Sequence, residues 1–457
     1  MKHRIHLVGI GGAGMSAIAR VLHQRGLAVG GSDLAASVYS RQLEAMGIEV
    51  HYGHQATNIN GADLVVASSA IPDDNVELAA ARQAGVPVLH RDDYLPQMLA
   101  DLRVVAVAGT HGKTTTTGLI AYLLEAAGLK PGFVVGGVLT DFDANAQAGG
   151  GELFVIEADE YARTFLALAP EIGVITNIEH DHPDCYPTQE DFVGAFTQFA
   201  EQVQDTLVVC GDDARAAALE PAKAKVIAYG FEEHNDWRAV DVRPNPAGGS
   251  DFLVLNDQAD SQLVRIRLPG QHNVLNALAA LAVSDCLGLD ARATREALLE
   301  YHGVSRRFEI LGERMGVIVV DDYAHHPTEI RATLQAARSR YPDRKIIAVF
   351  QPHTYSRLKA LWGDFTQAFK QADQVVVVDV FASREQPDPE VHVERLSEEI
   401  ESTEAVFISA LEEAAAYLAD TVTANSVVIT LSAGDGNRVG NLLLSKLQQR
   451  EESHDGN

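Results

Sequence analysis

The segment GTHGKTTTT at residues 109–117 has the residue types of a phosphate-binding loop. It follows the apolar run VVAVAG and precedes a segment of helical periodicity, which predicts a turn between a strand and a helix. In such a turn the backbone N–H groups bind phosphates, Lys113 supplies a positive charge and Thr114 a hydroxyl for Mg²⁺. The usual spacing has a glycine where this chain has Val107, so a purely structural turn is the alternative. The flanking elements favour ATP binding.

A second glycine-rich turn follows the first apolar run, IHLVGI. Gly9, Gly11 and Gly14 have the spacing of a dinucleotide-binding loop, and Asp33 lies about twenty residues further on, as that fingerprint requires. The pattern favours a pyrophosphate ligand, which need not be part of NAD. Glycines that serve only close packing of helix and strand are the alternative.

Acidic and histidine side chains gather at the ends of two further apolar runs, LFVIEAD (153–159) and IGVITN (172–177). They are Glu157, Asp159 and Glu160 for the first run, and His180, Asp181, His182 and Asp184 for the second. Open parallel sheets bind ligands at the carboxyl ends of their strands, where a carboxylate beside a phosphate loop commonly holds Mg²⁺. A solvated polar loop is the alternative for any one residue, but the set indicates function.

The last third of the chain repeats this placement in DDYAHHPTE (321–329) and FQPHTYSR (350–357). Both segments carry His and Tyr with Asp or Arg at a strand end, which indicates a ligand site. Alternatively, Pro327 and Thr328 begin a helix and Asp321 or Asp322 is a hydrogen-bonded strand-end carboxylate. LSAGDGNRVG (431–440) is equally compatible with a simple turn.

Short apolar runs alternate with helix-period segments in three blocks, which predicts an α/β protein with three domains. We expect an N-terminal Rossmann-like domain at 1–101, a central ATPase-type parallel sheet at 102–307 with a small antiparallel appendage between 236 and 269, and a C-terminal Rossmann-like domain at 308–457. The apolar runs at 405–409 and 426–432 lack a clear following helix. The polar tail at 449–457 is expected to be disordered.

Composition excludes several classes of protein. The net charge of −27 disfavours nucleic-acid and membrane-surface partners, so an anionic ligand needs local donors. Cys185, Cys210 and Cys286 are odd in number and widely spaced, which is typical of a reducing cytoplasm rather than of disulfides or structural zinc. Neither a signal peptide nor a membrane span is predicted. An NAD-dependent dehydrogenase leaves residues 109–117 unexplained, and a nonenzymatic nucleotide switch leaves the first and third blocks unexplained.

Together with GQHNVLNALAA (270–280) and GVSRRFE (303–309), these motifs resemble the Mur ligase family, in the family's order and over essentially the whole chain. The resemblance implies a UDP-sugar domain, a central ATPase domain and a third domain that closes over them. It also implies the ADP-forming ligation of L-alanine to UDP-N-acetylmuramate through an acyl phosphate, a cytoplasmic step of peptidoglycan precursor synthesis. The alternative within the family is recycling of a murein tripeptide. We expect Mg²⁺ as cofactor and a monomer or homodimer.

The resemblance also implies roles for individual residues, which fall into four groups. The ATP group is Gly109, Thr110, His111, Gly112, Lys113, Thr114, Thr115, Asn273, Asn276, Arg307 and Asp322. The UDP-sugar group is Gly11, Gly12, Gly14, Ser32, Asp33, Ser68 and Ser69. Tyr323, His325, His353 and Arg357 are implied for the amino acid, and Thr114, Glu157 and His182 for the metal. Catalysis is assigned to Lys113, Glu157, His182, Arg307 and Asp322.

Overall fold

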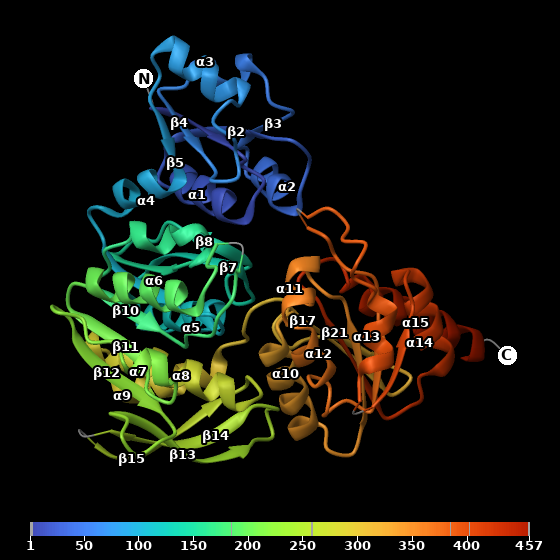
Figure 1. Ribbon diagram of the computed structural model, residues 1–457. Coiled ribbons are helices and arrows are strands. Elements are labelled where there is room, and N and C mark those ends of the chain that lie inside the picture. Colours follow the sequence, from blue (N-terminus) through green and yellow to red (C-terminus); the bar gives the residue numbers. More distant parts are fainter. Residues whose placement is uncertain (1–2, 184, 257–258, 384, 402, 456–457) are drawn as a thin grey trace. The chain divides into compact units, whose positions relative to one another are not determined.

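The computed structural model describes residues 3–183, 185–256, 259–383, 385–401 and 403–455. Three β-sheets follow one another along the chain, with helices between most of their strands (Figure 1). Two compact units are present: the first is Met1–Arg238, Val254–Ser261 and Asn276–Tyr301, and the second is Ala239–Leu253, Gln262–Leu275 and His302–Asn457. The predicted α/β fold with three domains is confirmed, and the exact boundaries at 101/102 and 307/308 remain predictions.

The first sheet is parallel and doubly covered, with the order β3-β2-β1-β4-β5. Its block contains β1 (Arg4–Val8), α1 (Ala13–Gln24), β2 (Ala28–Asp33), α2 (Val38–Ala45), β3 (Glu49–Tyr52), the 3₁₀ helix η1 (Ala56–Ile59), β4 (Leu64–Ala67), α3 (Val76–Ala84), β5 (Val88–His90) and α4 (Arg91–Leu99). Ile18 of α1 and Leu95 of α4 belong to the core on one face, and Leu78 of α3 to the core on the other. The strand order reverses between β1 and β4, so the glycine-rich turn after β1 lies where such sheets bind ligands.

The second sheet has ten strands in the order β15-β14-β13-β12-β11-β10-β6-β9-β7-β8. Its elements are β6 (Arg103–Ala108), α5 (Lys113–Ala126), β7 (Gly132–Leu139), β8 (Ala144–Gln147), β9 (Leu153–Glu157), the 3₁₀ helix η2 (Tyr161–Ala167), β10 (Ile172–Ile175), α6 (Gln189–Gln202), β11 (Thr206–Cys210), α7 (Ala214–Ala217), β12 (Lys225–Gly230), β13 (Trp237–Pro244), β14 (Ser250–Asn256), β15 (Ala259–Ile266), α8 (Gln271–Cys286) and α9 (Ala291–Glu300). β6 is paired in parallel with both β10 and β9. The segments that follow these three strands therefore begin at one edge of the sheet.

The third sheet has the order β16-β17-β21-β18-β19-β20, and helices cover both of its faces. Its elements are β16 (Glu309–Arg314), β17 (Val317–Asp322), α10 (Pro327–Arg340), β18 (Lys345–Phe350), α11 (Tyr355–Ala360), α12 (Trp362–Thr366), β19 (Gln374–Val377), α13 (Val393–Glu399), β20 (Glu404–Phe407), α14 (Leu411–Thr421), β21 (Ser426–Leu431) and α15 (Arg438–Asp455). β17 and β18 both pair in parallel with β21. The polar segments after β17, β18 and β21 thus share one edge.

Several details differ from the sequence-based expectations. The strands β3, β5 and β16 were not predicted, because all three are at most partly buried and β3 and β5 are also short. The last two strands are followed by helices, α14 and α15, contrary to expectation. The tail expected to be disordered continues α15 to Asp455, because Val439, Leu443 and Leu447 on this helix are buried against the sheet.

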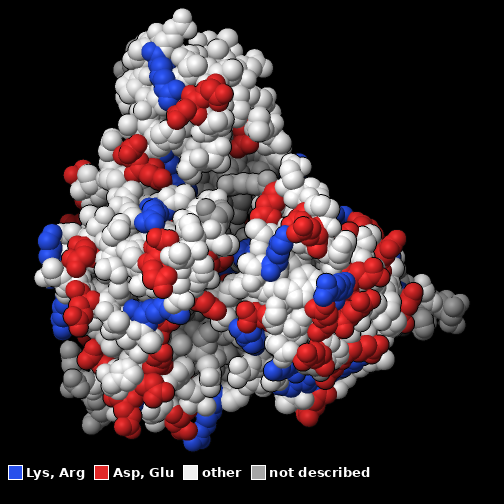
Figure 2. All heavy atoms as spheres, in the orientation of Figure 1, with Lys and Arg blue, Asp and Glu red and all other residues white. Residues whose placement is uncertain are grey.

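The surface reflects the acidic composition. Figure 2 shows Asp and Glu side chains over much of the visible face, with Lys and Arg side chains interspersed, in a chain of net charge −27. Among the described residues, no helix is long and apolar enough to cross a membrane.

A buried carboxylate, Glu77 of α3, connects helix and strands in the first domain. Its Oε2 accepts hydrogen bonds from Ser32 at 2.6 Å and from His6 at 2.9 Å, and its Oε1 accepts one from Asn58 at 2.7 Å. Burial alone would raise the pKa of Glu77, but the hydrogen bonds from His6, Ser32 and Asn58 outweigh it and lower the pKa to about 2. The ionised carboxylate therefore stabilises the end of β2 through its contact with Ser32.

We predict that Glu77→Gln lowers the free energy of unfolding at pH 7 by about 2 to 3 kcal/mol. The reason is that the folded protein stabilises the ionised carboxylate of Glu77, and Gln has no ionised form. A depressed native pKa stabilises the fold above the unfolded value of about 4.5, and this contribution is lost as the pH falls toward 2. Urea unfolding of wild type and variant should thus differ most at pH 7 and converge below about pH 4.5. The exposed Glu49→Gln serves as control; a difference that does not change with pH would contradict the assignment.

Candidate functional site

Glycine is required at two positions of the phosphate loop, residues 109–117, which connects β6 to α5. Gly109 has a φ of 131° and Gly112 a φ of 83°, in the left-handed region that side chains disfavour. A Cβ on Gly109 would overlap Oγ1 of Thr176, and one on Gly112 would lie 2.6 Å from Oδ1 of Asn276. The loop backbone therefore passes close to its neighbours, as a phosphate cradle must.

Hydrogen bonds fasten the phosphate loop to the segment after β10. The Thr110 hydroxyl donates to the carbonyl of Glu179 at 2.8 Å and accepts from the N–H of Glu179 at 2.9 Å. The side chain of Asn177 accepts from the N–H of His111 at 2.9 Å and donates to its carbonyl at 3.0 Å. The His111 ring lies 2.9 Å from the Glu179 carboxylate. Thr110 and His111, predicted to contact ATP, thus also fix the shape of the loop.

Lys113 is buried among acceptors. Its Nζ donates to the carbonyls of Gly109 and Thr110, at 2.6 and 3.1 Å, and pairs with the Glu160 carboxylate at 2.8 Å. Only 13% of the Lys113 side chain and 2% of the Glu160 side chain are exposed. Burial would lower the pKa of Lys113, but Glu160, Asp159 and Glu157 raise it above its usual value, so the ammonium is charged.

Glu157 ends β9 and faces the start of α5. Its Oε1 accepts from the Thr114 hydroxyl at 3.1 Å, and its Oε2 accepts from the N–H of Gly136 at 2.6 Å. Burial raises the pKa of Glu157, and burial together with the charge of Glu160 raises that of Asp159. Carboxylates that resist ionisation next to a hydroxyl form an oxygen-rich set that a divalent cation would stabilise. The donors present therefore fit the predicted Mg²⁺.

His182 approaches the same carboxylates from the segment after β10. Its Nε2 lies 3.5 Å from Oε1 of Glu160, and the Tyr161 ring packs edge-on against its imidazole at 5.1 Å between ring centres. His182 has a φ of 55°, and Ala162 and Arg163, which follow Tyr161, have φ values of 53° and 59°. These left-handed residues cost free energy and occur where the chain must hold functional side chains. Asp184 lies outside the described residues.

The two predicted asparagines of α8 have different surroundings. Asn276 belongs to the first unit and accepts a hydrogen bond from Thr116 of α5 at 3.2 Å, so it lies beside the predicted phosphate loop. Asn273 belongs to the second unit and donates to the Pro269 carbonyl at 2.7 Å. The assignment of Asn273 to ATP therefore stays a prediction.

The predicted UDP-sugar residues lie at the carboxyl ends of β1, β2 and β4. Asp33 accepts from the N–H of Gly11 at 2.8 Å and from the N–H of Leu34 at 2.7 Å, so it holds the glycine-rich turn in place. The Ser32 hydroxyl donates to Glu77. Gly12 is the N-cap of α1 and Gly14 lies in its first turn, while Ser68 and the exposed Ser69 follow β4.

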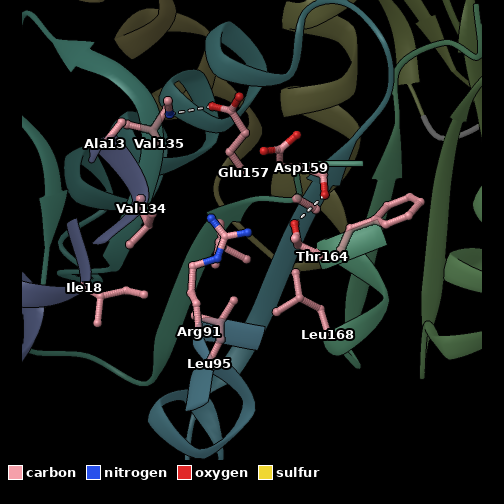
Figure 3. Close-up of a pocket in the computed structure, with 15 residues that line it drawn as sticks. Ala13, Ile18, Arg91, Leu95, Val134, Val135, Glu157, Asp159, Thr164 and Leu168 are labelled. Carbon is pink, nitrogen blue, oxygen red and sulfur yellow. Dashed lines mark hydrogen bonds between the residues drawn. The ribbon is translucent and has the colours of Figure 1, made fainter. Parts of the chain in front are cut away.

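A cavity of about 170 Å³ joins this turn to the carboxylates of the central domain. It is lined by residues of α1, α4, β7, β9 and η2, including Gly14, Arg91, Glu157, Asp159 and Thr164 (Figure 3). Most of the remaining walls are apolar. Arg91 extends from α4 into the cavity, and it was not among the residues predicted from the sequence.

In the second unit, Asp322 ends β17 as a buried carboxylate. Its oxygens accept from the N–H groups of Phe308 and Ala324, both at 2.8 Å. Burial raises the pKa of Asp322 to about 6, although the neighbouring Arg307 opposes the shift. Arg307 packs over the Tyr323 ring at 5.0 Å. The structure therefore brings together Arg307, Asp322 and Tyr323, which were predicted separately.

The other predicted amino-acid residues form a row of rings that ends at a guanidinium. The His325 ring lies 5.5 Å from the rings of both Tyr323 and His353. His353 stacks on Phe381 at 5.9 Å, and its Nδ1 lies 3.1 Å from Nη1 of Arg357, which is only 8% exposed. All four predicted residues thus lie in one cluster.

Sequence reasoning missed several residues that shape these sites. Phe381 lies in a loop without any motif, and a Cβ on Gly434 of the SAGDGN segment would overlap its ring. Gln351 accepts from Ser432 at 2.6 Å and from the N–H of Gly436 at 2.8 Å, which ties FQPH to SAGDGN. The position of Gln351 at a strand end was the available signal.

Three family models match successive parts of the chain. They are described as "Mur ligase family, catalytic domain" at residues 4–103, "Mur ligase middle domain" at 107–284 and "Mur ligase, glutamate ligase domain" at 306–434. The UDP-N-acetylmuramate–L-alanine ligases of Roseiflexus sp. (strain RS-1) and Syntrophobacter fumaroxidans are each 44% identical to this chain. The alignments cover 97% of this chain and 99% and 96% of the two relatives.

Solved structures of similar proteins are those of ligases as well. The UDP-N-acetylmuramate-alanine ligase MurC of Thermotoga maritima matches with a TM-score of 0.84 and 31% identity, over 98% of this chain and 99% of that one. A murein peptide ligase of Psychrobacter arcticus matches with a TM-score of 0.70 and 25% identity, over 97% of this chain and 98% of that one.

We predict that Lys113→Met and Glu160→Gln each lower the thermal unfolding temperature. The loss of stability in the double variant should be smaller than the sum of the losses in the two single variants. Removing one partner of a buried ion pair costs about 3 to 5 kcal/mol because the other charge stays buried and unpaired, whereas removing both relieves this penalty. Calorimetry of the four proteins gives the coupling. The exposed pair Arg82–Asp73 is the control, and strictly additive losses would show that Lys113 does not depend on Glu160.

Proposed function

The chain belongs to the Mur ligase family, and we propose how its described residues divide the family's reaction between them. The protein joins L-alanine to UDP-N-acetylmuramate in peptidoglycan synthesis, with ATP converted to ADP and phosphate. The observation that carries this conclusion is full-length similarity to L-alanine ligases together with a buried, charged Lys113 in a glycine-dependent phosphate loop. The resemblance stated from the sequence is confirmed.

The nucleotide binds at the phosphate loop in this proposal. Lys113 and the N–H groups that begin α5 take the β- and γ-phosphates, and Asn276 contributes from α8. We assign Arg307 and Asp322 to ATP as well, on the resemblance to the family. Thr114, Glu157 and His182 would hold Mg²⁺, which when bound offsets negative charge on the phosphates. Support comes from the 3.1 Å contact of Thr114 with Glu157 and from the raised pKa of the buried Glu157 and Asp159.

The reaction then needs charge neutralisation rather than a protein nucleophile. The muramyl carboxylate attacks the γ-phosphorus, the bond to ADP breaks, and an acyl phosphate forms. The neutral amine of L-alanine attacks the acyl carbon, loses a proton to His182 or a nearby carboxylate, and expels phosphate, which carries away one former carboxylate oxygen. Lys113 counters the repulsion between the carboxylate and the γ-phosphate, because both are anions.

The amino acid binds at the cluster of Tyr323, His325, His353 and Arg357. Arg357 offers a planar, bidentate donor to the α-carboxylate, for which Lys is a poor substitute. The contact of Arg357 with the His353 ring supports this role, because it orients the guanidinium. The UDP-sugar binds at Gly11, Gly12, Gly14, Ser32, Asp33, Ser68 and Ser69. Cytoplasmic localisation and a monomeric or homodimeric state remain our predictions.

The alternative of tripeptide recycling rests on the likeness to the murein peptide ligase of Psychrobacter arcticus. That likeness is weaker in both identity and TM-score than the likeness to the alanine ligase of Thermotoga maritima. L-alanine is therefore the better supported substrate.

We predict that UDP-N-acetylmuramate labelled with ¹⁸O in its carboxylate transfers one label per turnover to phosphate. The reason is that the carboxylate oxygen bonded to phosphorus leaves with it when the amine attacks. Mass spectrometry of phosphate and chromatography of nucleotides check the label and the formation of ADP. Unlabelled phosphate or AMP would rule out the mechanism, and turnover of the murein tripeptide in place of L-alanine would establish the recycling activity.

Arg357→Lys is expected to raise the KM for L-alanine by at least about tenfold and to leave the KM values for ATP and UDP-N-acetylmuramate within about twofold, because only the bidentate pair is lost. Initial rates with each substrate varied in turn give these values. Lys359→Arg, an exposed substitution in the same helix, is the control. A lower unfolding temperature with all three KM values equally changed would instead show that Arg357 only stabilises the start of α11.

A further inference from the structure

Arg91 is a cation in a largely apolar cavity that none of the roles above explains. It is the first residue of α4, and its side chain is 20% exposed. Among the described residues, the guanidinium has one hydrogen-bond or ion-pair partner, Asp92, at 3.2 Å from Nε. Glu157 and Asp159 line the same cavity but form no ion pair with it within the part of the chain described. The Nη atoms therefore face the cavity with unused donors.

The first turn of α1 comes close to this guanidinium because residue 14 is glycine. A Cβ on Gly14 would lie 3.0 Å from Nη1 of Arg91. α1 has twelve residues, and its N-cap, Gly12, provides no side-chain acceptor for the N–H groups of that turn. Helix N-termini of this kind attract anions. Two independent sources of positive potential, the α1 N-terminus and Arg91, thus meet at one end of the cavity.

The order of residues along the cavity indicates the direction in which a UDP-sugar would extend. Gly11 lies against Asp33 at the end of β2, and Gly14 lies against Arg91. Glu157, which ends β9, and Asp159, two residues later, line the same cavity, and Figure 3 shows the Arg91 side chain extending toward them. A UDP-sugar that enters at Asp33 would therefore pass α1 and Arg91 before its muramyl carboxylate reached the phosphate loop region.

We propose that Arg91 binds the β-phosphate, the phosphate distal to uridine, of the UDP-sugar against the first turn of α1. This inference rests on the proposed function and assigns a positioning residue to it. A guanidinium offers a phosphate two parallel N–H donors. Arg91 is the one Lys or Arg among the described residues that line this cavity. By holding the diphosphate, Arg91 sets how far the muramyl end extends toward Glu157.

The test compares three ligands without ATP or L-alanine. Isothermal titration with UMP, UDP and UDP-N-acetylmuramate is performed on wild type and on Arg91→Ala. The variant should bind UDP and UDP-N-acetylmuramate about 10- to 100-fold more weakly, and UMP within about threefold of wild type, because only the first two carry the β-phosphate. Arg91→Lys should recover part of the lost affinity, since lysine keeps the positive charge but lacks the two parallel N–H donors of a guanidinium.

Control variants separate this role from others. Arg82→Ala removes an exposed arginine of the same domain and should leave all three affinities unchanged. If Arg91 only pairs with its neighbour, Asp92→Ala and Arg91→Ala will shift the unfolding temperature alike and leave the UDP to UMP affinity ratio unchanged. A loss confined to UDP-N-acetylmuramate would assign Arg91 to the muramyl carboxylate and overturn the proposal, as would equal losses for UMP and UDP.

Failure of this inference is distinguishable from failure of the proposed function. Wild-type protein that forms ADP with L-alanine while Arg91→Ala keeps its affinity for UDP would refute only the role of Arg91. Absence of L-alanine-dependent ADP formation in wild type would refute the function itself, whatever the nucleotide affinities.

Discussion

The cost of burying the Lys113 ammonium governs much of the structure around residues 109–117. An unpaired charge in such a place would be strongly destabilising, so the loop carbonyls and Glu160 must surround it. Glu160 in turn must stay ionised, and the charges of Lys113 and His182 lower its pKa against the effect of burial. The Tyr186 hydroxyl donates to the Glu160 carbonyl at 2.5 Å, which fixes the backbone there. The left-handed residues Ala162 and Arg163 come after Tyr161, so backbone strain lies close to this carboxylate.

Local chemistry made a large part of the site predictable. Residues 109–117 form a loop whose function depends on its own backbone, and parallel pairing of β6 with β9 and β10 brings Glu157 and His182 to it, as the strand-end positions indicated. Partners distant in sequence were not predictable, since nothing near Arg91 or Phe381 marks them as neighbours of Gly14 or His353. The strands β3, β5 and β16 were missed because none of them contains a long apolar run. In α15, the spacing of Val439, Leu443 and Leu447 was the signal that the polar tail obscured.

Because the chain is acidic, a buried Lys or Arg is a stronger indication of anion binding than it would be in a basic protein. Phosphates and carboxylates are repelled by the overall charge of −27, so binding depends on fixed, short-range donors. Lys113, Arg307 and Arg357 each have a neighbour that orients them: Glu160, the Tyr323 ring and the His353 ring. Short-range donors of this kind discriminate between substrates by geometry more than by charge.

Helix α1 contributes to both the first domain and the central domain. Its N-terminal turn carries the glycine-rich loop of the first domain, and along its length it contacts β7 and β8 of the central sheet and shares one core with that domain. The first two domains are therefore not interchangeable modules. A chimera that took its N-terminal domain from a relative, in order to accept a different activated sugar, would need the facing surfaces of β7 and β8 from the same donor.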